Sequence, residues 1–501
     1  MEKDVRFPDL FYRQRLNAVG IPMLLSVSLF ALFSDAALVL FFVGIVVLLF
    51  AFFATGERRK ILLCVLVGIS LALFTRGICG MEEKRMEKYL NESVFAQGYV
   101  VKTSENSFDL ALVKMDDKPF YKTFRVEGEE EVRQGEKICL ILTVTEIAPE
   151  KDRSEGIFCL ANAESKREKI GKSLLFSLVS HIRQPLLEAF SGGDEGGFLS
   201  AILLGDKSGI SSLKESFSKT ASQHILAISG LHVSQFIGFF VIVLNLFPVS
   251  RRVTRILLFP LVGILFLLGG GGISVFRAGF MTLFSLLALL ARRRADSVTN
   301  LVFAASVLVF LSPYTVENFS FLFSFLSTFA LVSCAVPLSE YYASRIVKIG
   351  ERANLFEKIL IAAVSSFTIS SAVFVFLLPL QIILMGNVQL FSPIYALILI
   401  PLFQVCLIAA LLGALLVFLP FSMPFLSEGV LWVQKAFLTL VTALADAAPP
   451  LVELGKWSVP TALFFACLLL LFFVRKEKLS RIHLLHFASI FAFGFLYLFL
   501  L

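Results

Sequence analysis

Long apolar runs recur along this chain, and they constrain its fold more than any other feature. The run at 17–54 breaks only around Ser34 and Asp35. It is too long for one membrane span of about 20 residues, so it predicts a helical hairpin. With 57% apolar and 17% charged residues, the chain has too much apolar surface for water alone. We therefore predict a polytopic α-helical membrane protein.

The apolar pattern predicts about thirteen spanning helices. After the hairpin, a third span covers 61–79. Further helices are expected at 224–247, 256–269, 274–290, 297–311, 319–338, 359–385, 393–419, 428–447, 459–474 and 484–501. Charged residues interrupt the segment at 428–447. We count it as a span because the basic residues at 475–481 then lie on the same side as the other basic loops.

One polar segment, residues 81–172, interrupts the apolar pattern. Its apolar residues alternate in short runs at 94–101, 108–113 and 137–147, which indicates β-strands. About five short strands match a small β-barrel of the OB type. The acidic residues around Glu127 argue against a phosphate-binding surface and favour a lid or assembly role, while DNA binding stays an open alternative. The predicted domains are therefore 1–80, 81–172 and 173–501.

The basic residues predict which way the helices cross the membrane. The N-terminal segment and the loop at 58–60 are rich in Lys and Arg, so both belong on the cytoplasmic side, and the polar insert 81–172 lies outside. Basic loops at 251–255, 292–294 and 345–358 then return to the inside by simple alternation. The amphipathic stretch 174–190 is expected to lie in the plane of the membrane interface. We predict a location in the cytoplasmic (inner) membrane.

The cysteines and short motifs exclude several classes of site. No CxxC pair or Cys/His cluster occurs, so no metal and no cofactor is predicted. Cys79, Cys139 and Cys159 fall at or in the polar insert, and pairing of two of them in an oxidising compartment stays open. No phosphate-binding Walker element is present, so transport energy has to come from another protein.

Polar residues enter the first span after the insert, and they are the candidate functional residues. His224 and His232 are eight positions apart, so one helix would place them on the same face, with Ser229 and Gly230 between them. Polar groups inside a membrane are costly unless they face protein or water, so this stripe is expected to line a polar path. A structural role for the histidines is the alternative.

Arg277 lies just after a glycine break at 269–272. Its planar donors suit a phosphate, although an ion-paired or snorkelling arginine is equally consistent with the sequence.

These segments resemble the ComEC family of competence DNA channels. The family has a Gly-Asp-x-Ser-Gly element followed by Ser-His-Leu-Leu-Ala-Ile-Ser-Gly-Leu-His-Val. The first is matched by Gly205, Asp206, Ser208 and Gly209, and nine of eleven positions match in the second, at 223–233. Residues 273–281 are similar to the family's Arg-Ala-x-x-Met helix, and 320–325 and 392–401 to later elements. Ser320, Leu322 and Ala396 depart from the family's Gly, Gln and Asn.

The resemblance implies an inner-membrane channel that takes up single-stranded DNA during natural transformation. His224, Ser229, Gly230, His232 and Arg277 would line the substrate path, and the Gly205–Gly209 element would be structural. The chain has five histidines and no His-x-His-x-Asp-His run, so a metallo-β-lactamase-like nuclease site is not expected in it. The implied partners are a DNA receptor, a helicase-like motor and a separate nuclease.

Three alternatives remain. A transporter or channel for another solute would explain the intramembrane polar groups, and a noncatalytic scaffold would explain the polar insert. A membrane-embedded hydrolase ranks last, since no nucleophile and carboxylate pair accompanies the histidines. We therefore do not expect an enzyme.

Overall fold

The structure is a computed structural model, and it describes most of residues 56–453 together with Val19 and Pro22–Leu24. The gaps within 56–453 are 104–106, 117, 129–131, 133–134, 150–151, 154, 165–167, 173, 191, 207, 227, 270–272, 292–295, 347–353 and 419–423. Most of the predicted hairpin at 17–54 and the predicted spans 459–474 and 484–501 lie outside the described residues. The chain forms two compact units, Met1–Gln184 with Val302–Leu322, and Pro185–Leu301 with Phe323–Leu501.

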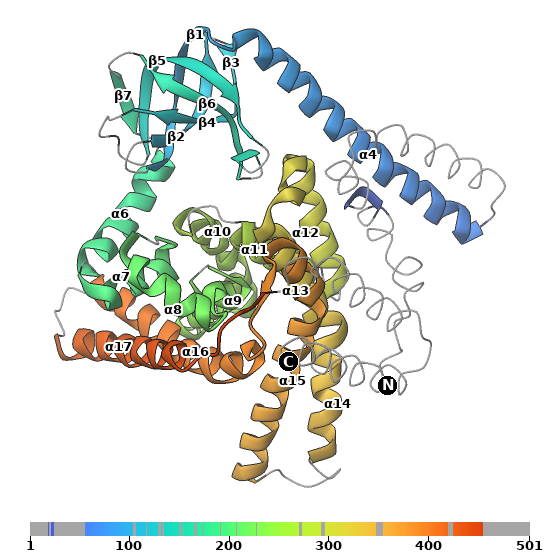
Figure 1. The fold of residues 1–501 in the computed structure, drawn as a ribbon, viewed down its shortest axis with the longest axis vertical. Helices are drawn as coiled ribbons and strands as arrows, with labels where there is room; N and C mark the ends of the chain where they lie inside the picture. Colours follow the sequence, from blue (N-terminus) through green and yellow to red (C-terminus); the bar gives the residue numbers. More distant parts are fainter. Residues whose placement is uncertain are drawn as a thin grey trace. The chain divides into compact units, whose positions relative to one another are not determined.

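In the first unit, a long helix leads directly into a β-sheet domain. Helix α4 (Gly56–Met86) contains the predicted span at 61–79 and continues through the one-turn helix η1 (Glu87–Tyr89) into the first strand (Figure 1). The strands are β1 (Ser93–Thr103), β2 (Ser107–Met115), β3 (Lys118–Pro119), β4 (Thr123–Glu127), β5 (Glu136–Ile147), β6 (Ile157–Ala163) and β7 (Glu168–Lys172). The alternating apolar runs therefore form strands, as predicted.

The seven strands form one sheet in the order β1-β2-β4-β6-β5-β7, with β3 paired to β2. β1 also pairs with β5, and β4 runs parallel to β6, while the other pairings are antiparallel. The alternation of buried and exposed residues in β2 turns one face toward a core built around Leu110, Phe124 and Leu142. A separate sheet domain is thus confirmed. It has seven strands where about five were predicted.

The three cysteines of this region lie in the interior and are not joined to one another. Cys79 on α4, Cys139 on β5 and Cys159 on β6 are all buried, and no disulfide links any two of them. Burial raises the pKa of the Cys159 thiol to about 12. At neutral pH this thiol is therefore a small apolar core group and a poor partner for a disulfide.

Ionic contacts attach the sheet domain to the end of α4. Arg153, in the turn before β6, forms a salt bridge of 2.7 Å with Glu83, and its guanidinium lies 4.7 Å from the centroid of the Tyr314 ring. Tyr314 belongs to the short helix η4 (Pro313–Glu317), and its hydroxyl donates to the same Glu83 carboxylate. Lys122 pairs with the neighbouring Glu82 at 2.5 Å. The sheet domain, α4 and η4 therefore meet at one point.

The rest of the described chain is helical. The helices are α6 (Leu174–Ala189), α7 (Gly193–Leu204), η2 (Ser208–Leu213), α8 (Lys214–Lys219), η3 (Gln223–Ile225), α9 (Gly230–Asn245), α10 (Arg251–Leu268), α11 (Ile273–Leu290), α12 (Ser297–Leu311), α13 (Phe319–Ala330), the π-turn η5 (Leu331–Ala335), α14 (Val336–Ile346), α15 (Leu355–Met385), α16 (Ser392–Val417) and α17 (Pro424–Asp446). In the described part of the chain, a helix lies at each predicted position, although several helix ends differ from the prediction by more than a turn.

Four helices in the described part of the chain are long and apolar enough to cross a membrane. They are Phe319–Ile346, Leu355–Met385, Ser392–Val417 and Ser427–Asp446. The last of these is the segment at 428–447 whose charges made it ambiguous. Shorter apolar helices lie at Gly230–Asn245, Ser274–Leu290 and Ser297–Leu311. Together with the composition, these helices indicate a membrane protein.

A two-strand pairing joins the ends of α15 and α17. β8 (Asn387–Val388) pairs antiparallel with β9 (Val452–Glu453). The buried Gln389 amide donates to the carbonyl of Lys219 at 2.8 Å and to that of Pro449 at 3.2 Å. These bonds hold the ends of α8, α15 and α17 together.

Candidate functional site

The start of α9 lies six residues later than predicted, and this changes the geometry of the two histidines. Ser229 is extended, with φ −116° and ψ 179°, and occupies the N-cap position, so α9 begins at Gly230. The Ser229 N–H donates to Nδ1 of His232 at 3.1 Å, which satisfies a backbone donor at the helix start. His224 instead lies on η3 and is exposed. The prediction that both histidines share one helix face is therefore wrong.

His232 packs inside a cluster of aromatic rings. It is 0% exposed, and its ring centroid lies 5.0 Å from that of Phe403 on α16. Phe403 in turn contacts Phe198 of α7 and Phe437 of α17, at 6.5 and 6.2 Å between centroids. Phe198 also stacks on Phe217 of α8 at 6.0 Å. His232 thus packs α9 against α16, as part of an aromatic cluster that also includes α7, α8 and α17, and its side chain is fully buried.

The hydrogen bonds of His232 fix its tautomer. Nδ1 accepts the Ser229 N–H, and the Ser229 hydroxyl lies 3.0 Å from the same nitrogen. The neutral ring therefore carries its proton on Nε2. Nε2 is buried and has no hydrogen-bond partner in the described part of the chain. Ser229 thus sets the orientation of a histidine whose other nitrogen points into the aromatic cluster.

Arg277 and Gly230, both predicted path residues, lie against each other. A Cβ atom placed on Gly230 would be only 3.1 Å from Nη2 of Arg277. One turn earlier on α11, the Ser274 hydroxyl donates to the Ser324 hydroxyl of α13 at 3.0 Å. The guanidinium of Arg277 lies 5.9 Å from the centroid of Phe325, also on α13. Three segments that are far apart in the sequence, at 229–232, 274–277 and 324–325, therefore meet.

The Gly205–Gly209 element forms a tight turn after α7. Gly205 has φ 70° and ends α7 in the left-handed conformation, which favours glycine. Gly209, in η2 (Ser208–Leu213), lies so close to α7 that a Cβ on Gly197 would be 2.2 Å from the Gly209 carbonyl oxygen. Glycine at both positions lets two backbones touch. The structural role implied for this element stays a prediction.

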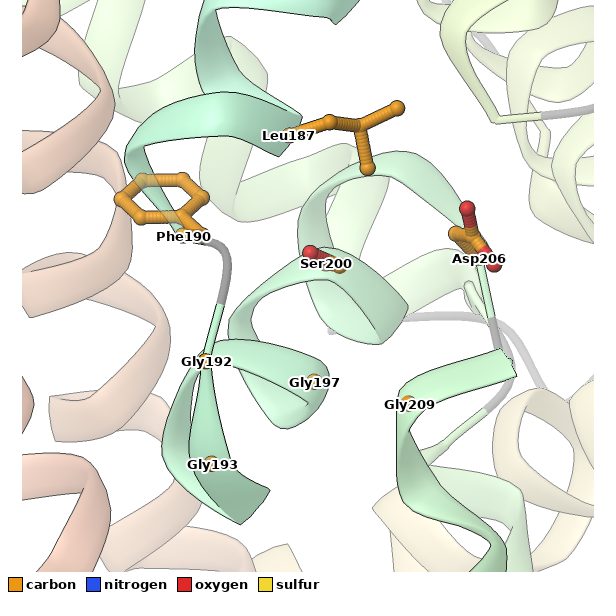
Figure 2. Close-up of a pocket in the computed structure, with 8 residues that line it drawn as sticks. All are labelled: Leu187, Phe190, Gly192, Gly193, Gly197, Ser200, Asp206 and Gly209. Atoms are coloured by element: carbon orange, nitrogen blue, oxygen red, sulfur yellow. The ribbon is translucent and has the colours of Figure 1, made fainter.

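The same element also lines an open pocket, which the sequence did not reveal. The pocket has a volume of about 440 Å³ and is lined by Leu187, Phe190, Gly192, Gly193, Gly197, Ser200, Asp206 and Gly209 (Figure 2). Figure 2 shows these residues coming from the end of α6, from α7 and from the turn into η2. The glycine pairs at 192–193 and 196–197 are the sequence signal that could have indicated a close backbone approach here.

The described residues give no sign of a metal site. Among them, no three His, Cys, Asp or Glu side chains gather closely enough to hold a metal ion. Asp206 of the Gly205–Gly209 element lies in the turn between α7 and η2, where its N–H donates to the Ser200 carbonyl at 3.3 Å.

Comparison with known proteins identifies the family. Residues 202–479 match the family model described as "Competence protein", and this range covers more than half of the 501 residues. Over 141 residues, the chain is 31% identical to ComE operon protein 3 of Bacillus subtilis strain 168, which covers 28% of this chain but only 18% of that relative. No solved structure matches. The matched range contains α9, α11, α13 and α16, the helices that meet at His232 and Arg277. The chain therefore belongs to the Competence protein family, the ComEC family that its motifs resemble.

Proposed function

We propose that this protein is a channel in the cytoplasmic membrane that takes up single-stranded DNA during natural transformation. The observation that carries the proposal is the family match over residues 202–479. The contacts described above support it, because the segments that resemble the family's motifs come together around Gly230 and Arg277. In this proposal, partner proteins supply the DNA receptor, the motor and the nuclease.

In this proposal, the packing around the start of α9 corresponds to a closed state of the channel. His232 is fully buried against Phe403, and the start of α9 contacts Arg277 on α11. A single strand of DNA needs a polar passage wider than the separation of packed side chains. Conduction therefore requires α9 to move away from α16 or from α11.

We infer that the sheet domain faces outward. Chain alternation from the basic loop at 58–60 places the end of α4 outside. The contact of Glu83 and Arg153 with Tyr314 requires η4 to lie on the same side as the sheet domain. The basic residues at 292–294 precede the other end of α12, so positive charge lies on the opposite side. Both features support the same orientation.

We also infer that the sheet domain is of the OB type. Its pairings run from β1 through β2, β4, β6 and β5 and return to β1, and β4 is parallel to β6, which supports a closed five-strand arrangement. β3 and β7 would be additions at its edge.

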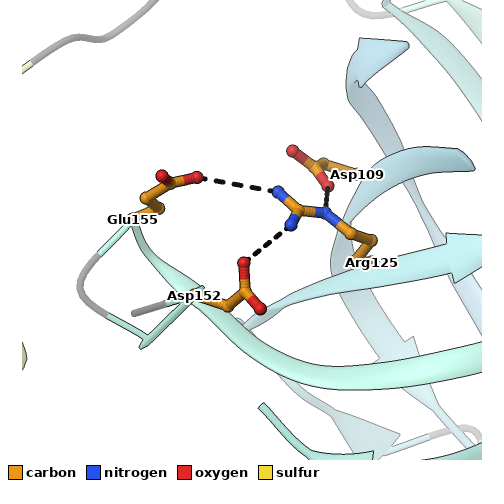
Figure 3. A network of polar contacts seen from close by, with 4 residues as sticks. All are labelled: Asp109, Arg125, Asp152 and Glu155. Atoms are coloured by element: carbon orange, nitrogen blue, oxygen red, sulfur yellow. Dashed lines mark hydrogen bonds and ion pairs between the residues drawn. The ribbon is translucent and has the colours of Figure 1, made fainter. Parts of the chain in front are cut away.

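Charge on the β2–β4 surface supports an assembly role for this domain. Arg125 on β4 hydrogen-bonds to Asp109 at 3.0 Å and to Asp152 at 2.7 Å, with Glu155 at 3.8 Å (Figure 3). Burial alone lowers the pKa of Arg125, but these three carboxylates raise it overall above its ordinary value. One arginine facing three carboxylates leaves this surface acidic, which disfavours a DNA backbone. The domain is then a platform for protein partners or a lid.

Deletion of the gene in its host tests the proposal. The deletion should abolish transformation by linear DNA and leave attachment of DNA to the cell surface intact. An unchanged transformation frequency would refute the channel.

Point variants separate a channel from a scaffold. Ser229→Ala and His232→Ala remove the contact that orients α9, so a channel should lose uptake of labelled DNA while its partners still co-purify with it. His181→Ala, at an exposed histidine on α6, is the matched control and should behave as wild type. Loss of co-purification together with uptake would favour the scaffold. Uptake of a small solute by reconstituted protein, without DNA uptake, would favour the transporter.

A further inference from the structure

The guanidinium of Arg277 is buried, and it forms no ion pair with any carboxylate that the structure describes. The residue is 7% exposed, and its Nε has no hydrogen-bond acceptor in the described part of the chain. The guanidinium lies over the face of Phe325, whose ring centroid is 5.9 Å away. A cation that is taken out of water normally requires an anionic partner, because an aromatic face compensates for only part of the lost hydration.

The neighbour of Arg277 is the positive end of a helix. Nη2 lies 3.1 Å, and Cζ 3.9 Å, from the position that a Cβ of Gly230 would occupy. Gly230 is the first residue of α9, a helix of sixteen residues whose N-terminus carries a partial positive charge. Two positive groups in contact repel each other unless an anion lies between or beside them.

Backbone donors at the start of α9 add to this positive site. The first intrahelical bond runs from the Val233 N–H to the Ser229 carbonyl at 3.2 Å, and the Ser229 N–H is bonded to His232. The N–H groups of Gly230 and Leu231 precede that first bond, so the helix offers them no acceptor. Both residues are partly exposed. The Arg277 guanidinium and these two helix-terminal amides therefore lie close together at the start of α9.

We infer that this place is a phosphodiester-binding site, formed by Arg277 and the first turn of α9. The inference rests on the proposed function. In it, the channel holds the DNA by one backbone phosphate at a time, and the site makes no contact that depends on the base sequence. A planar guanidinium and helix N-terminal amides are the donors that bind phosphate oxygens in proteins. Gly230 has no side chain, and this lets the guanidinium approach the helix end.

The position of the site favours a nucleic-acid phosphate over a lipid headgroup. Arg277 lies among α9, α11 and α13, in contact with Gly230 and Phe325, and it is nine-tenths buried. Lipid headgroups reach side chains on the outer surface of a bundle, where an arginine extends toward water. With the sheet domain outside, α9 and α11 both begin at the outer ends of their spans. The site therefore lies where an incoming strand would first enter the helices.

The test uses the full chain in lipid nanodiscs and two probes. One probe is a fluorescent single-stranded oligonucleotide, and the other has the same sequence with uncharged methylphosphonate linkages. Arg277→Gln should weaken binding of the phosphodiester probe by about tenfold or more, the value of one charge-assisted hydrogen bond, and should leave the uncharged probe unaffected. The affinity of Arg277→Lys for the phosphodiester probe should lie between those of wild type and Arg277→Gln, because lysine keeps the charge and lacks the planar donors.

Two further variants control for folding and for general charge. Gly230→Ala keeps Arg277 but places a methyl group 3.1 Å from Nη2. It should therefore weaken binding of the phosphodiester probe although the net charge of the protein is unchanged. Arg252→Gln removes an exposed arginine at the start of α10 and should bind as wild type at constant salt. Thermal unfolding of each variant in the nanodisc identifies loss of fold.

The outcomes are distinct. Folded Arg277→Gln protein that binds the phosphodiester probe like wild type overturns the site. If Arg277→Gln weakens binding only in nanodiscs of anionic lipid and not in nanodiscs of phosphatidylcholine, the arginine binds a lipid headgroup. This result also overturns the phosphodiester site. If wild type binds no oligonucleotide while sulfate raises its unfolding temperature through Arg277, the anion site is upheld and the proposed DNA channel fails.

Discussion

Gly197→Ala tests the contact between α7 and the Gly205–Gly209 turn. The added Cβ would lie 2.2 Å from the Gly209 carbonyl oxygen and 2.6 Å from its carbonyl carbon. Ordinary van der Waals contact begins near 3.4 Å, and both neighbours are backbone atoms, so the two segments have to separate by more than an ångström. Overpacking of this kind costs about 1–3 kcal/mol, against a gain of about 0.5–1 kcal/mol from replacing a helical glycine.

The matched control is Gly238→Ala in the middle of α9. It makes the same chemical change in a helix, and no atom lies within 4 Å of the new Cβ. It should therefore be neutral or stabilising, and Gly197→Ala should be less stable than Gly238→Ala by about 1–3 kcal/mol, which is the cost of the overpacking. The assay is the fraction of monodisperse protein that remains in detergent after heating, measured across temperature for both variants and wild type. Equal stability of the two variants would refute the backbone contact.

Three further predictions concern the sheet domain. Glu83→Gln and Arg153→Met should each destabilise the protein. A double-mutant cycle on thermal unfolding should give a coupling energy of about 1–2 kcal/mol between the two residues, since the pair is only partly buried. Purely additive effects of the two substitutions would contradict the ion pair. Cys159, whose pKa is raised to about 12, should resist thiol reagents in the folded protein. Its contribution to stability should be full below about pH 8.5, the pKa of a thiol in the unfolded chain, and should be lost as the pH rises toward 12. The Cys159→Ala variant should lose less stability over that pH range. Arg125→Gln should destabilise the domain, because it leaves three carboxylates close together without their cation, and high salt should reduce this loss by screening their repulsion; a loss of stability that is independent of salt would argue against that repulsion.

Hydropathy predicted the helices well because a span is a local property of about 20 residues. The strands at 94–101 and 137–147 were equally local, since alternation with a period of two shows in a few residues. The start of α9 was missed because 224–228 is largely apolar and joins the helix pattern without a break. The signal that ends it is Ser229 with His232 three residues later, in a position where Glu or Gln is the usual partner.

Other parts of the site had no local signal at all. The contact of Arg277 with Gly230 and the burial of His232 against Phe403 join residues tens to more than a hundred positions apart. The same is true of Glu83 and Tyr314, which are 231 residues apart. Resemblance of motifs selected the candidate residues, but only the packing of helices shows which of them touch. His224 illustrates the difference, because it belongs to the motif and lies exposed on η3.

The bonds of Gln389 have a consequence for how the protein is made. Its buried amide donates to the carbonyl of Lys219, which is synthesised 170 residues earlier, and to that of Pro449, which is synthesised 60 residues later. The bond to Lys219 can form as soon as residue 389 has been made, but the bond to Pro449 cannot. Until α17 has been inserted and β9 reaches β8, one of the two N–H groups of the Gln389 amide therefore lacks the partner that it has in the folded protein. Nascent chains that stop before residue 449 should accordingly be handled as incomplete by the insertion and quality-control machinery, even though most of their helices are already in place.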